Sequence, residues 1–475
     1  MVIIIQLILF LLFNLVFIPI TITYGQSPNV VIILTDDQGW ADVGYNNPKA
    51  YTPNMDKLAR SGALFTNHYV MAQCTPTRVA LMTGKYPSRF GRHATSATNH
   101  PAFPKGTITL AHIYKSKGYE TCLSGKWHLG STPNHGPNHF GFDQSYGSLA
   151  GAVGMYDHRY RKGDLAITWH RNHQIIDREE NGIHATDLVT NDAIRFIKQK
   201  RKKPFFLYLP YHATHTPLDE RGSLKDLPTR INPKNPNRWL NEDKIPWFHD
   251  PLGKIQREKD PEKRLFLAAL NHLDHGIGQV VSALQETDQY HNTLILFSSD
   301  NGPQVNWGGK AYPDDLRLTD FNQPVPMRGK KRDVYEGGIK VPGFAVWPKK
   351  IKPATIEHPM HIVDWLPTLA KIVGYQKPAD IVWDGVDQSR TILKGENSPE
   401  RDFYWIQGNH CKAVRHIDWK IVCYSKKSPQ KPSDWALYNL SKDPLERNDL
   451  SSSHPEILAN LHNRFLTHRA LDKTP

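Results

Sequence analysis

The stretch Asn29-Val30-Val31-Ile32-Ile33-Leu34-Thr35, followed by Asp36-Asp37-Gln38-Gly39, decides the fold that the sequence predicts. It opens with a continuous apolar, β-branched run, which is typical of a central parallel strand covered on both faces. In open α/β sheets, ligand groups collect beyond the carboxyl ends of the strands. The adjacent carboxylates of Asp36 and Asp37 would repel each other there, so they favour a bound cation; a solvated Asp-Asp turn is the alternative.

A second apolar run has the same ending. Thr293-Leu294-Ile295-Leu296-Phe297-Ser298-Ser299 closes with Asp300-Asn301-Gly302. Two such strands would bring carboxylate and amide oxygens to one edge of the sheet, without Cys or His ligands. An all-oxygen set excludes a zinc-type site and favours a hard divalent ion such as calcium or magnesium. The predicted ligands are Asp36, Asp37, Asp300 and Asn301.

The segment Cys74-Thr75-Pro76-Thr77-Arg78 precedes an apolar run that stops at Gly84. This pattern predicts a helix that begins near Cys74 and ends at the glycine. The unpaired N–H groups of a helix start attract an anion, and Arg78, one turn further on, would direct a cation to the same place. The alternatives are a buried structural cysteine or a disulfide between Cys74 and Cys122.

The segment Ser124-Gly125-Lys126-Trp127-His128-Leu129-Gly130 follows a short strand-like stretch, Glu120 to Leu123. Lys126 and His128 are two residues apart, so in an extended stretch they project to the same side. They are therefore candidates for one functional site. A surface cation and a core histidine are the alternatives.

A third buried strand, Pro204 to Pro210, is followed by His212 and His215. No third soft ligand lies nearby and no His-Glu-x-x-His motif occurs, so a metal role for this pair is not favoured. We assign His215 to acid–base chemistry, and His212 either to a structural role or to supporting the residues that contact the ligand.

A glycine-rich basic loop, Met327 to Arg332, precedes Tyr335 to Pro342. Its Lys330 and Lys331 fit the capture of an anion, whereas a solvated basic turn is the alternative.

The whole chain is basic. Its 475 residues contain 59 Lys and Arg against 46 Asp and Glu, a formal net charge of +13. This balance favours anionic partners, including nucleic acid, acidic membranes and sulfated or phosphorylated substrates. Because the basic residues are spread along the chain and form no nucleic-acid motif, we expect no nucleic-acid partner.

An apolar run from Val2 to Ile22 predicts a secretory signal over residues 1–25, so contact with a membrane is expected only during export. An uncleaved signal anchor is the alternative. Among the cysteines, Cys122 is expected to be a buried free thiol, and Cys411 and Cys423 could staple a hairpin.

The predicted fold class is α/β, with a large domain built on a central, mostly parallel sheet between helices. From roughly Gly374 onward, short segments alternate with polar turns. The expected organisation is a catalytic domain over residues 26–373 and a smaller C-terminal α+β domain, with a short antiparallel sheet, over residues 374–475.

Five motifs in this order resemble the sulfatase branch of the alkaline-phosphatase-like superfamily, and arylsulfatase B-type enzymes in particular. They are Thr-Asp-Asp-Gln-Gly, Cys-Thr-Pro-Thr-Arg, Gly-Lys-Trp-His-Leu-Gly, His-Thr-Pro and Ser-Asp-Asn-Gly. The basic loop and a closing segment, Leu437 to Glu446, extend the resemblance to nearly the whole mature chain.

The resemblance implies that Cys74 is oxidised to formylglycine by a formylglycine-generating enzyme and hydrated to a gem-diol. It implies one calcium ion, with an oxygen of the modified Cys74 as a further ligand beside Asp36, Asp37, Asp300 and Asn301.

It also implies roles for the remaining candidates. Arg78 and Lys126 would stabilise the alkoxide, and His128 would later accept the proton of the diol. His215 and Lys331 would contact the sulfate and the leaving oxygen. The family usually has Gly-Gly-Lys in the basic loop where this chain has Gly329-Lys330-Lys331. Spacing to Glu336 favours Lys331, and Lys330 remains open.

The leading hypothesis is a secreted sulfatase, periplasmic or extracellular (lysosomal in a eukaryote), that acts on a sulfated carbohydrate such as an algal polysaccharide or a glycosaminoglycan. The candidate sugar contacts are His158, Arg159, His170 and Trp307. The alternatives are a phosphodiester or phosphonate hydrolase with the same metal site, and a non-catalytic polyanion-binding protein with an unmodified Cys74.

Overall fold

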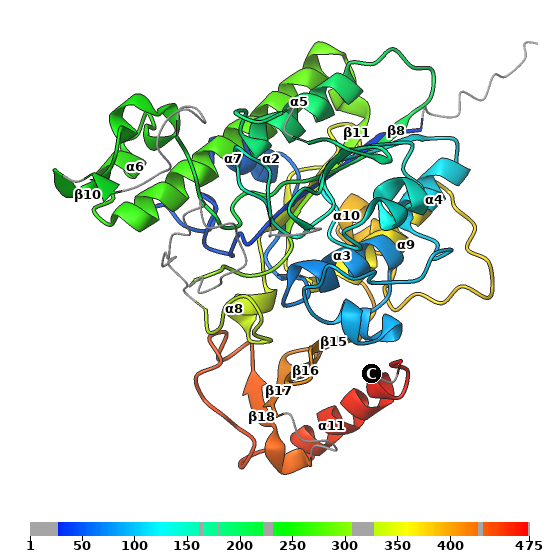
Figure 1. Cartoon of the computed structure of the whole chain (residues 1–475). Helices are drawn as coiled ribbons and strands as arrows, with labels where there is room; N and C mark the ends of the chain where they lie inside the picture. The colour runs from blue at the N-terminus through cyan, green and yellow to red at the C-terminus, as the bar shows by residue number, and fades with distance from the viewer. Residues whose placement is uncertain are drawn as a thin grey trace, which may run out of the picture.

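The computed structural model describes residues 27–160, 165–177, 180–221, 231–232, 234–305, 327–425 and 431–473. Ten strands form one large sheet in the order β13-β2-β12-β11-β1-β8-β4-β5-β6-β7 (Figure 1). These strands are β1 (Asn29–Thr35), β2 (Ala63–Phe65), β4 (Glu120–Lys126), β5 (Gln144–Ser148), β6 (Trp169–Arg171), β7 (Gln174–Ile175), β8 (Phe205–Pro210), β11 (Thr293–Ser299), β12 (Gly343–Val346) and β13 (Ala354–Ile356).

The centre of this sheet is parallel, as the apolar runs predict. β1 pairs with β11 on one side and with β8 on the other, and β4 pairs with β8 and β5, always in the parallel sense. Thr35 is opposite Ser299, so the residues that follow β1 and β11 leave the sheet side by side. The carboxyl ends of β11, β1, β8 and β4 therefore share one edge, where ligands collect in open α/β sheets.

The alternation of side chains along β1 divides the interior into two cores. Val30, Ile32 and Leu34 pack into one core and Val31 and Ile33 into the other, and none of these side chains is more than 1% exposed. The first core takes up α3 (Cys74–Thr83), α4 (Leu110–Ser116) and α9 (Trp365–Ile372). The second takes up α2 (Pro53–Arg60), α5 (Ala185–Ile197) and α7 (Pro261–Glu286). Helices thus cover both faces, which confirms the predicted α/β class.

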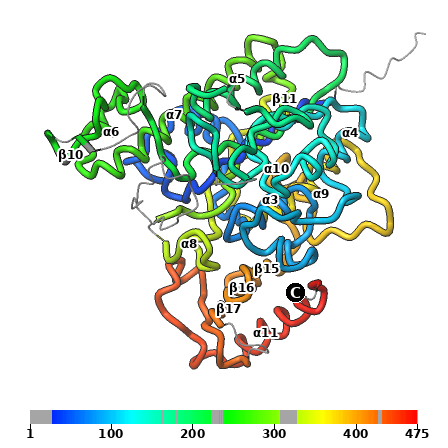
Figure 2. The backbone as a smooth tube through the Cα atoms, viewed as in Figure 1, coloured from blue at the N-terminus to red at the C-terminus, as the bar shows by residue number. Residues whose placement is uncertain are grey.

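A smaller sheet lies near the C-terminus, at the lower end of the view in Figure 2. Its antiparallel order is β15-β16-β17-β18. Its elements are β15 (Asp402–Gln407), β16 (Cys411–His416), β17 (Trp419–Tyr424), β18 (Ala436–Asn439) and the helix α11 (Pro455–Arg469). The indole N–H of Trp405 donates to the carbonyl of Val70 at 2.8 Å, so the small sheet packs against the large domain. The predicted α+β architecture of this part is confirmed, and the boundary at residues 373/374 stays a prediction.

Several further short strands and α-helices lie in the described part of the chain. They are β3 (His68–Tyr69), β14 (Met360–His361), β9 (Ile231–Asn232), β10 (Asn235–Trp239), α6 (Lys254–Arg257), α8 (Glu336–Ile339) and α10 (Ser389–Lys394). Among the described residues, no helix is both long enough and apolar enough to cross a membrane. The predicted signal segment, residues 1–25, lies outside the described residues.

The predicted staple between Cys411 and Cys423 is wrong. In the antiparallel pair of β16 and β17, Cys411 is opposite Tyr424 and Cys423 is opposite Lys412. Because consecutive residues of a strand face opposite ways, the two thiols lie on opposite faces of the sheet. All four cysteines are free and buried. This confirms Cys122 as a buried thiol and excludes the alternative disulfide between Cys74 and Cys122.

Candidate active site

The four predicted oxygen ligands meet at the carboxyl edge of the sheet. Asp36 and Asp37 follow β1, Asp300 and Asn301 follow β11, and all four side chains are fully buried. The backbone N–H of Asp37 donates to Oδ1 of Asp300 at 3.3 Å, and Nδ2 of Asn301 donates to Oδ1 of Asp37 at 2.7 Å. Asp37 has a left-handed backbone, with φ of 61°, which turns the chain back into the site directly after the strand.

Two lysines from distant segments each contact one of these carboxylates. Nζ of Lys331 lies 2.7 Å from Oδ1 and 2.9 Å from Oδ2 of Asp37, while Nζ of Lys126, the last residue of β4, contacts Oδ2 of Asp36. Lys331 holds the pKa of Asp37 well below its usual range, against the opposing effect of burial. Lys331 is 5% exposed, whereas its neighbour Lys330 is exposed to solvent. The structure therefore places Lys331 in the cluster and Lys330 outside it.

The third cation, Arg78, comes from α3, whose ten residues are all buried. The helix begins at Cys74 and ends at Gly84 in a left-handed conformation, as its sequence predicts. The Arg78 guanidinium donates to Oδ2 of Asp300 at 2.8 Å and to the carbonyl of Lys126, also at 2.8 Å. It also lies 3.8 Å from Oδ2 of Asp36. Arg78 thus ties the helix start to the ends of β4 and β11.

Cys74 lies at the first position of α3, 2% exposed. Burial raises the pKa of its thiol, and the nearby cations Lys126 and Lys331 only partly oppose that effect. The next residue, Thr75, donates a hydroxyl hydrogen bond to the carbonyl of His128 at 3.3 Å, which links the helix start to the loop after β4. Because the thiolate is the reactive form of cysteine, the unmodified side chain is poorly suited to act as a nucleophile here.

Two histidines face the same region. Nδ1 of His215 hydrogen-bonds the carbonyl of Thr216 at 2.6 Å, and Nε2 lies 3.7 Å from Oδ2 of Asp37. His128 is 4% exposed, and its Nδ1 has no hydrogen-bond partner among the described residues. Burial and the surrounding cations lower the pKa of both rings well below the usual range, so both are neutral at pH 7 in this arrangement.

His212 has a different environment from His215. It is 2% exposed, and its ring stacks on Trp169 with centroids 5.5 Å apart. Within the described part of the chain, neither ring nitrogen has a hydrogen-bond partner. These contacts are consistent with the structural role predicted for His212, which stays a prediction.

The donor set fits a hard divalent cation. Two buried oxygens, Oδ1 of Asp36 and Oδ1 of Asn301, have no hydrogen-bond partner among the described residues. Burial and the charge of Asp300 raise the pKa of Asp36 to about 7, so a bound cation would relieve an unfavourable concentration of negative charge. Ligand atoms of Asp36, Asp37 and His215 lie within 4.8 Å of one another. Carboxylate and amide oxygens are the ligands that calcium prefers.

Comparison with known proteins agrees with this geometry. A family model described as sulfatase matches residues 28–375, and one described as N-sulphoglucosamine sulphohydrolase, C-terminal, matches residues 329–470. The chain belongs to the sulfatase family. It is accordingly a sulfuric ester hydrolase with the fold of the alkaline-phosphatase-like sulfatases.

Two mouse proteins illustrate the similarity. Arylsulfatase J is 32% identical over 495 residues, covering 93% of this chain and 76% of that protein. N-acetylgalactosamine-6-sulfatase is 31% identical over 414 residues, covering 82% of this chain and 70% of that protein. The solved structure of Ps i-CgsB superposes with a TM-score of 0.74 at 29% identity, covering 94% of each chain. A second structure of that protein, in complex with k-i-k-neocarrahexaose, gives a TM-score of 0.73 at 28% identity, again over 94% of each chain.

The structure does not support every predicted sugar contact of this sulfatase. His170 is 1% exposed, and its ring nitrogens are used by the carbonyl of Gly147 at 2.7 Å and by the hydroxyl of Ser145 at 3.1 Å. His170 therefore has no ring nitrogen left for a sugar. Its prediction as a sugar contact is wrong, because the antiparallel pairing of β5 and β6 turns its side chain inward.

The other predicted sugar contacts are His158, Arg159 and Trp307. His158 is 4% exposed, stacks on Trp169 at 4.5 Å and hydrogen-bonds a carbonyl through Nε2, and its role as a sugar contact stays a prediction. Arg159 pairs with Asp157 at 2.9 Å and keeps a side chain that is 27% exposed, so it stays a prediction. Trp307 lies outside the described residues.

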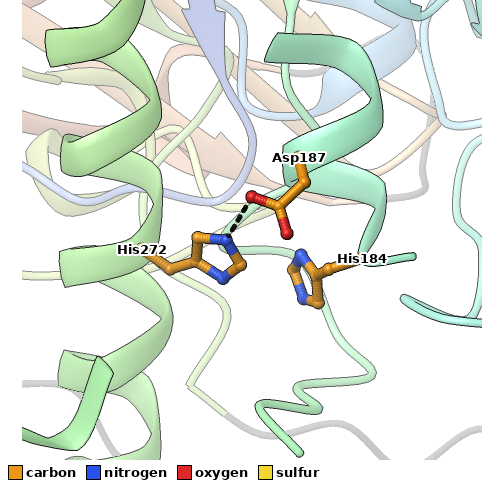
Figure 3. A group of neighbouring side chains, drawn as sticks. All are labelled: His184, Asp187 and His272. Atoms are coloured by element: carbon orange, nitrogen blue, oxygen red, sulfur yellow. Dashed lines mark hydrogen bonds and ion pairs between the residues drawn. The ribbon is translucent and has the colours of Figure 1, made fainter. Parts of the chain in front are cut away.

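Sequence reasoning missed a second cluster of histidines and carboxylates in this sulfatase, in which both histidines are buried and Asp187 is partly exposed; Figure 3 draws His184, Asp187 and His272. His272 of α7 hydrogen-bonds Oδ1 of Asp187 through Nε2 at 3.0 Å and Oε2 of Glu220 through Nδ1 at 2.9 Å. The two carboxylates raise the pKa of His272 to about 9, so the ring carries a proton on both nitrogens at pH 7. The indole of Trp247 stacks on the ring at 3.9 Å.

This second cluster is a charge network that joins three segments. His184 precedes α5 and accepts a hydrogen bond from the backbone N–H of Thr186 through Nδ1, at 3.1 Å. Its Nε2 lies 3.5 Å from Oε1 of Glu220. Since one nitrogen of His184 already accepts a hydrogen bond and both nitrogens of His272 face carboxylates, the arrangement fits bound protons better than a metal ion. Glu220 follows His215 on the same loop, so the network anchors that loop to α5 and α7.

Proposed function

We propose that this sulfatase removes sulfate from a sulfated carbohydrate, through a formylglycine made from Cys74 and a calcium ion. The observation that carries the proposal is the buried convergence of Cys74, four oxygen donors and three cations at one edge of the sheet. Support for a carbohydrate substrate comes from the printed names of relatives, N-acetylgalactosamine-6-sulfatase among them, and from the complex of Ps i-CgsB with k-i-k-neocarrahexaose.

The proposed calcium ligands are Asp36, Asp37, Asp300, Asn301 and an oxygen of the modified Cys74. When bound, the ion offsets the negative charge that the sulfate oxygens bring into the site. Two buried oxygens, on Asp36 and Asn301, lack a hydrogen-bond partner within the described part of the chain, which supports this ligand set.

Modification of Cys74 supplies the nucleophile that the thiol lacks. A hydrated aldehyde offers one hydroxyl for attack on sulfur and a second hydroxyl whose deprotonation releases the sulfate, which a serine or a thiol cannot do. The raised pKa of the buried thiol agrees with a side chain that acts only after conversion. The proposal therefore includes a formylglycine-generating enzyme as a partner during maturation.

The cations and His128 act on the modified residue. Arg78 and Lys126 are fixed by buried ion pairs, so they stabilise an alkoxide without reorganising during the reaction. His128 accepts the proton of the second hydroxyl in this scheme. Its low pKa keeps the ring neutral and therefore able to accept a proton.

His215 and Lys331 act on the substrate. Nδ1 of His215 donates to the carbonyl of Thr216, which fixes the ring with Nε2 toward Asp37. The neutral ring carries its proton on Nδ1, so in this scheme His215 takes up a second proton when the substrate binds, and Nε2 passes that proton to the leaving sugar oxygen. Lys331, whose Nζ contacts Asp37, also binds the sulfate in this scheme. The proposal retains a signal over residues 1–25, export from the cytoplasm, and domains over residues 26–373 and 374–475.

The test is sulfate release from a panel of defined sulfated mono- and oligosaccharides, beside the matching phosphate monoesters and diesters. The proposal predicts turnover of at least one sulfated sugar, loss of activity with a chelator and recovery with calcium. Faster turnover of the phosphate esters, or turnover that the chelator leaves unchanged, would contradict it.

A further inference from the structure

The edge of the sheet opposite the active site carries a basic groove that the reaction does not use. Its volume is 470 Å³, and it lies between the end of α5, the start of β8 and the turn after α7. In Figure 1, α5 and β8 are labelled in the upper part of the view, away from α8. The basic residues that line it are Lys198, Lys200, Arg201, Lys202 and Lys203.

Two of the five cations in the groove have structural partners. Arg201 donates to the carbonyl of Phe196 in the last turn of α5 and lies 3.2 Å from the carboxylate of Glu120. Lys198 pairs with Glu286 at 2.8 Å. Cations are favoured at a helix C-terminus, so the fold explains these two residues without a ligand.

The other three cations have no such explanation. Lys200, Lys202 and Lys203 are exposed, and they form no ion pair or hydrogen bond within the described residues. Among the described residues that line the groove, Asp288 is the one acidic residue, and it is exposed. Three like charges within four residues repel one another, so the free protein gains nothing from holding them together. An anionic partner would remove that repulsion.

The walls of the groove are preformed. Asn29 accepts a hydrogen bond from the backbone N–H of Phe205 at 3.0 Å and donates to the side chain of Gln289 at 3.3 Å. Gln289 in turn donates to the carbonyl of Ile197 at 3.1 Å. These bonds join the starts of β1 and β8 to α5 and α7, so a ligand would meet an ordered concave surface. A concave shape suits a linear polymer better than the plane of a membrane.

We propose that this groove is an exosite for a sulfated polysaccharide chain, which holds a polymeric substrate while the active site processes it. The inference rests on the proposed function. β8 connects the two edges, and its six residues span roughly 20 Å at about 3.3 Å per residue. A monosaccharide in the active site therefore does not reach the groove, whereas a polymer does. The exosite affects polymeric substrates and leaves small ones unchanged.

The test compares two triple variants of the full chain with the same change in charge. One is Lys200→Gln/Lys202→Gln/Lys203→Gln. The matched control is Lys349→Gln/Lys350→Gln/Lys352→Gln, three exposed lysines on the turn after β12. Binding of dextran sulfate is measured against salt concentration, beside binding of vesicles containing phosphatidylserine. Sulfate release is measured on a small aryl sulfate and on a sulfated polymer.

The groove variant is expected to bind dextran sulfate about tenfold more weakly at low salt, with a shallower salt dependence, and to have a higher KM for the polymer only. The control should match the wild type. Equal losses in both variants, or no loss in either, would overturn the exosite, because net charge alone would then explain binding. A selective loss of vesicle binding would overturn it in favour of a membrane contact. If the wild type releases sulfate from no substrate, the proposed function fails, while the dextran sulfate result still decides whether the groove binds a polyanion.

Discussion

The guanidinium of Arg78 and the carboxylate of Asp300 form an ion pair of 2.8 Å in which both side chains are fully buried. Arg78 comes from the helix that begins at Cys74, and Asp300 follows β11, so this contact joins the proposed nucleophile to the proposed metal site. Removing one partner of a buried pair leaves an uncompensated charge, which is more harmful than losing the attraction itself.

We therefore expect Arg78→Ala to lower the free energy of unfolding by about 3–5 kcal/mol in the presence of a chelator. The loss should be smaller with calcium, because the ion would compensate Asp300. Urea denaturation with and without calcium measures both values. Arg60→Ala, at an exposed pair with Asp56, is the control and should change stability by less than about 1 kcal/mol. Equal losses for the two variants would count against the buried pair.

Lys331 and Lys330 provide a matched comparison within one loop. Lys331 is buried against Asp37, and Lys330 is exposed. We expect Lys331→Ala to reduce kcat/KM on an aryl sulfate by about 100-fold or more, since removing one preorganised group that stabilises developing charge has an effect of this size. Lys330→Ala should stay near the wild-type value. Steady-state kinetics measure kcat/KM of both variants. A larger loss for Lys330→Ala than for Lys331→Ala would show that Lys330 binds the sulfate.

Gly151 makes room for His128. A Cβ at position 151 would lie 2.3 Å from Nε2 of His128, which is far inside van der Waals contact. Gly151→Ala should therefore displace the ring and lower kcat by about 10- to 100-fold, because catalysis is sensitive to misplacement by an ångström. Thermal unfolding of the same variant serves as the control for folding. If kcat of Gly151→Ala equals that of the wild type, the result would argue against a catalytic role for His128.

His272 should make stability depend on pH in the alkaline range. Its pKa is raised to about 9, from an ordinary value of 6.5, by Glu220 and Asp187. The group binds its proton more tightly when folded, so its contribution is fully present below about pH 6.5 and is lost as the pH rises through about 9. That contribution is on the order of 3 kcal/mol.

The other groups that face His272 are His184 and the stacked indole of Trp247, and His275 acts through Asp187. Urea denaturation at pH 6.5 and pH 9.5 should show a large stability difference between the wild type and His272→Gln at the lower pH and a small one at the higher pH. His291→Gln, at an exposed histidine, is the control. A difference between the wild type and His272→Gln that does not change with pH would contradict the charge network.

Much of the site could be predicted because its parts are local in sequence. Asp36 and Asp300 each follow an apolar strand, and parallel pairing of β1 with β11 leaves no other place for them than one edge. The helix start at Cys74 and its stop at Gly84 are likewise signalled within a few residues.

The predictions that were wrong, and the cluster that was missed, depend on contacts between segments that no sequence pattern relates. Cys411 and Cys423 flank a hairpin, but their faces depend on a register that a shift of one residue would reverse. His170 is polar in sequence, yet β-pairing buries it. Glu220 and His272 lie on different elements and belong to no motif, so only the folded chain brings them together.

The central claim is that Cys74, once converted, is the nucleophile of a calcium-dependent sulfatase. Replacing it by serine preserves the size and polarity of the helix start but removes the precursor of the aldehyde. Sulfate release by the wild type and by Cys74→Ser, with the mass of the wild-type peptide that contains residue 74, tests the claim most directly. The account predicts an aldehyde in that peptide and no turnover by the variant, whereas a free thiol in the active wild type, or full activity of the variant, would contradict it.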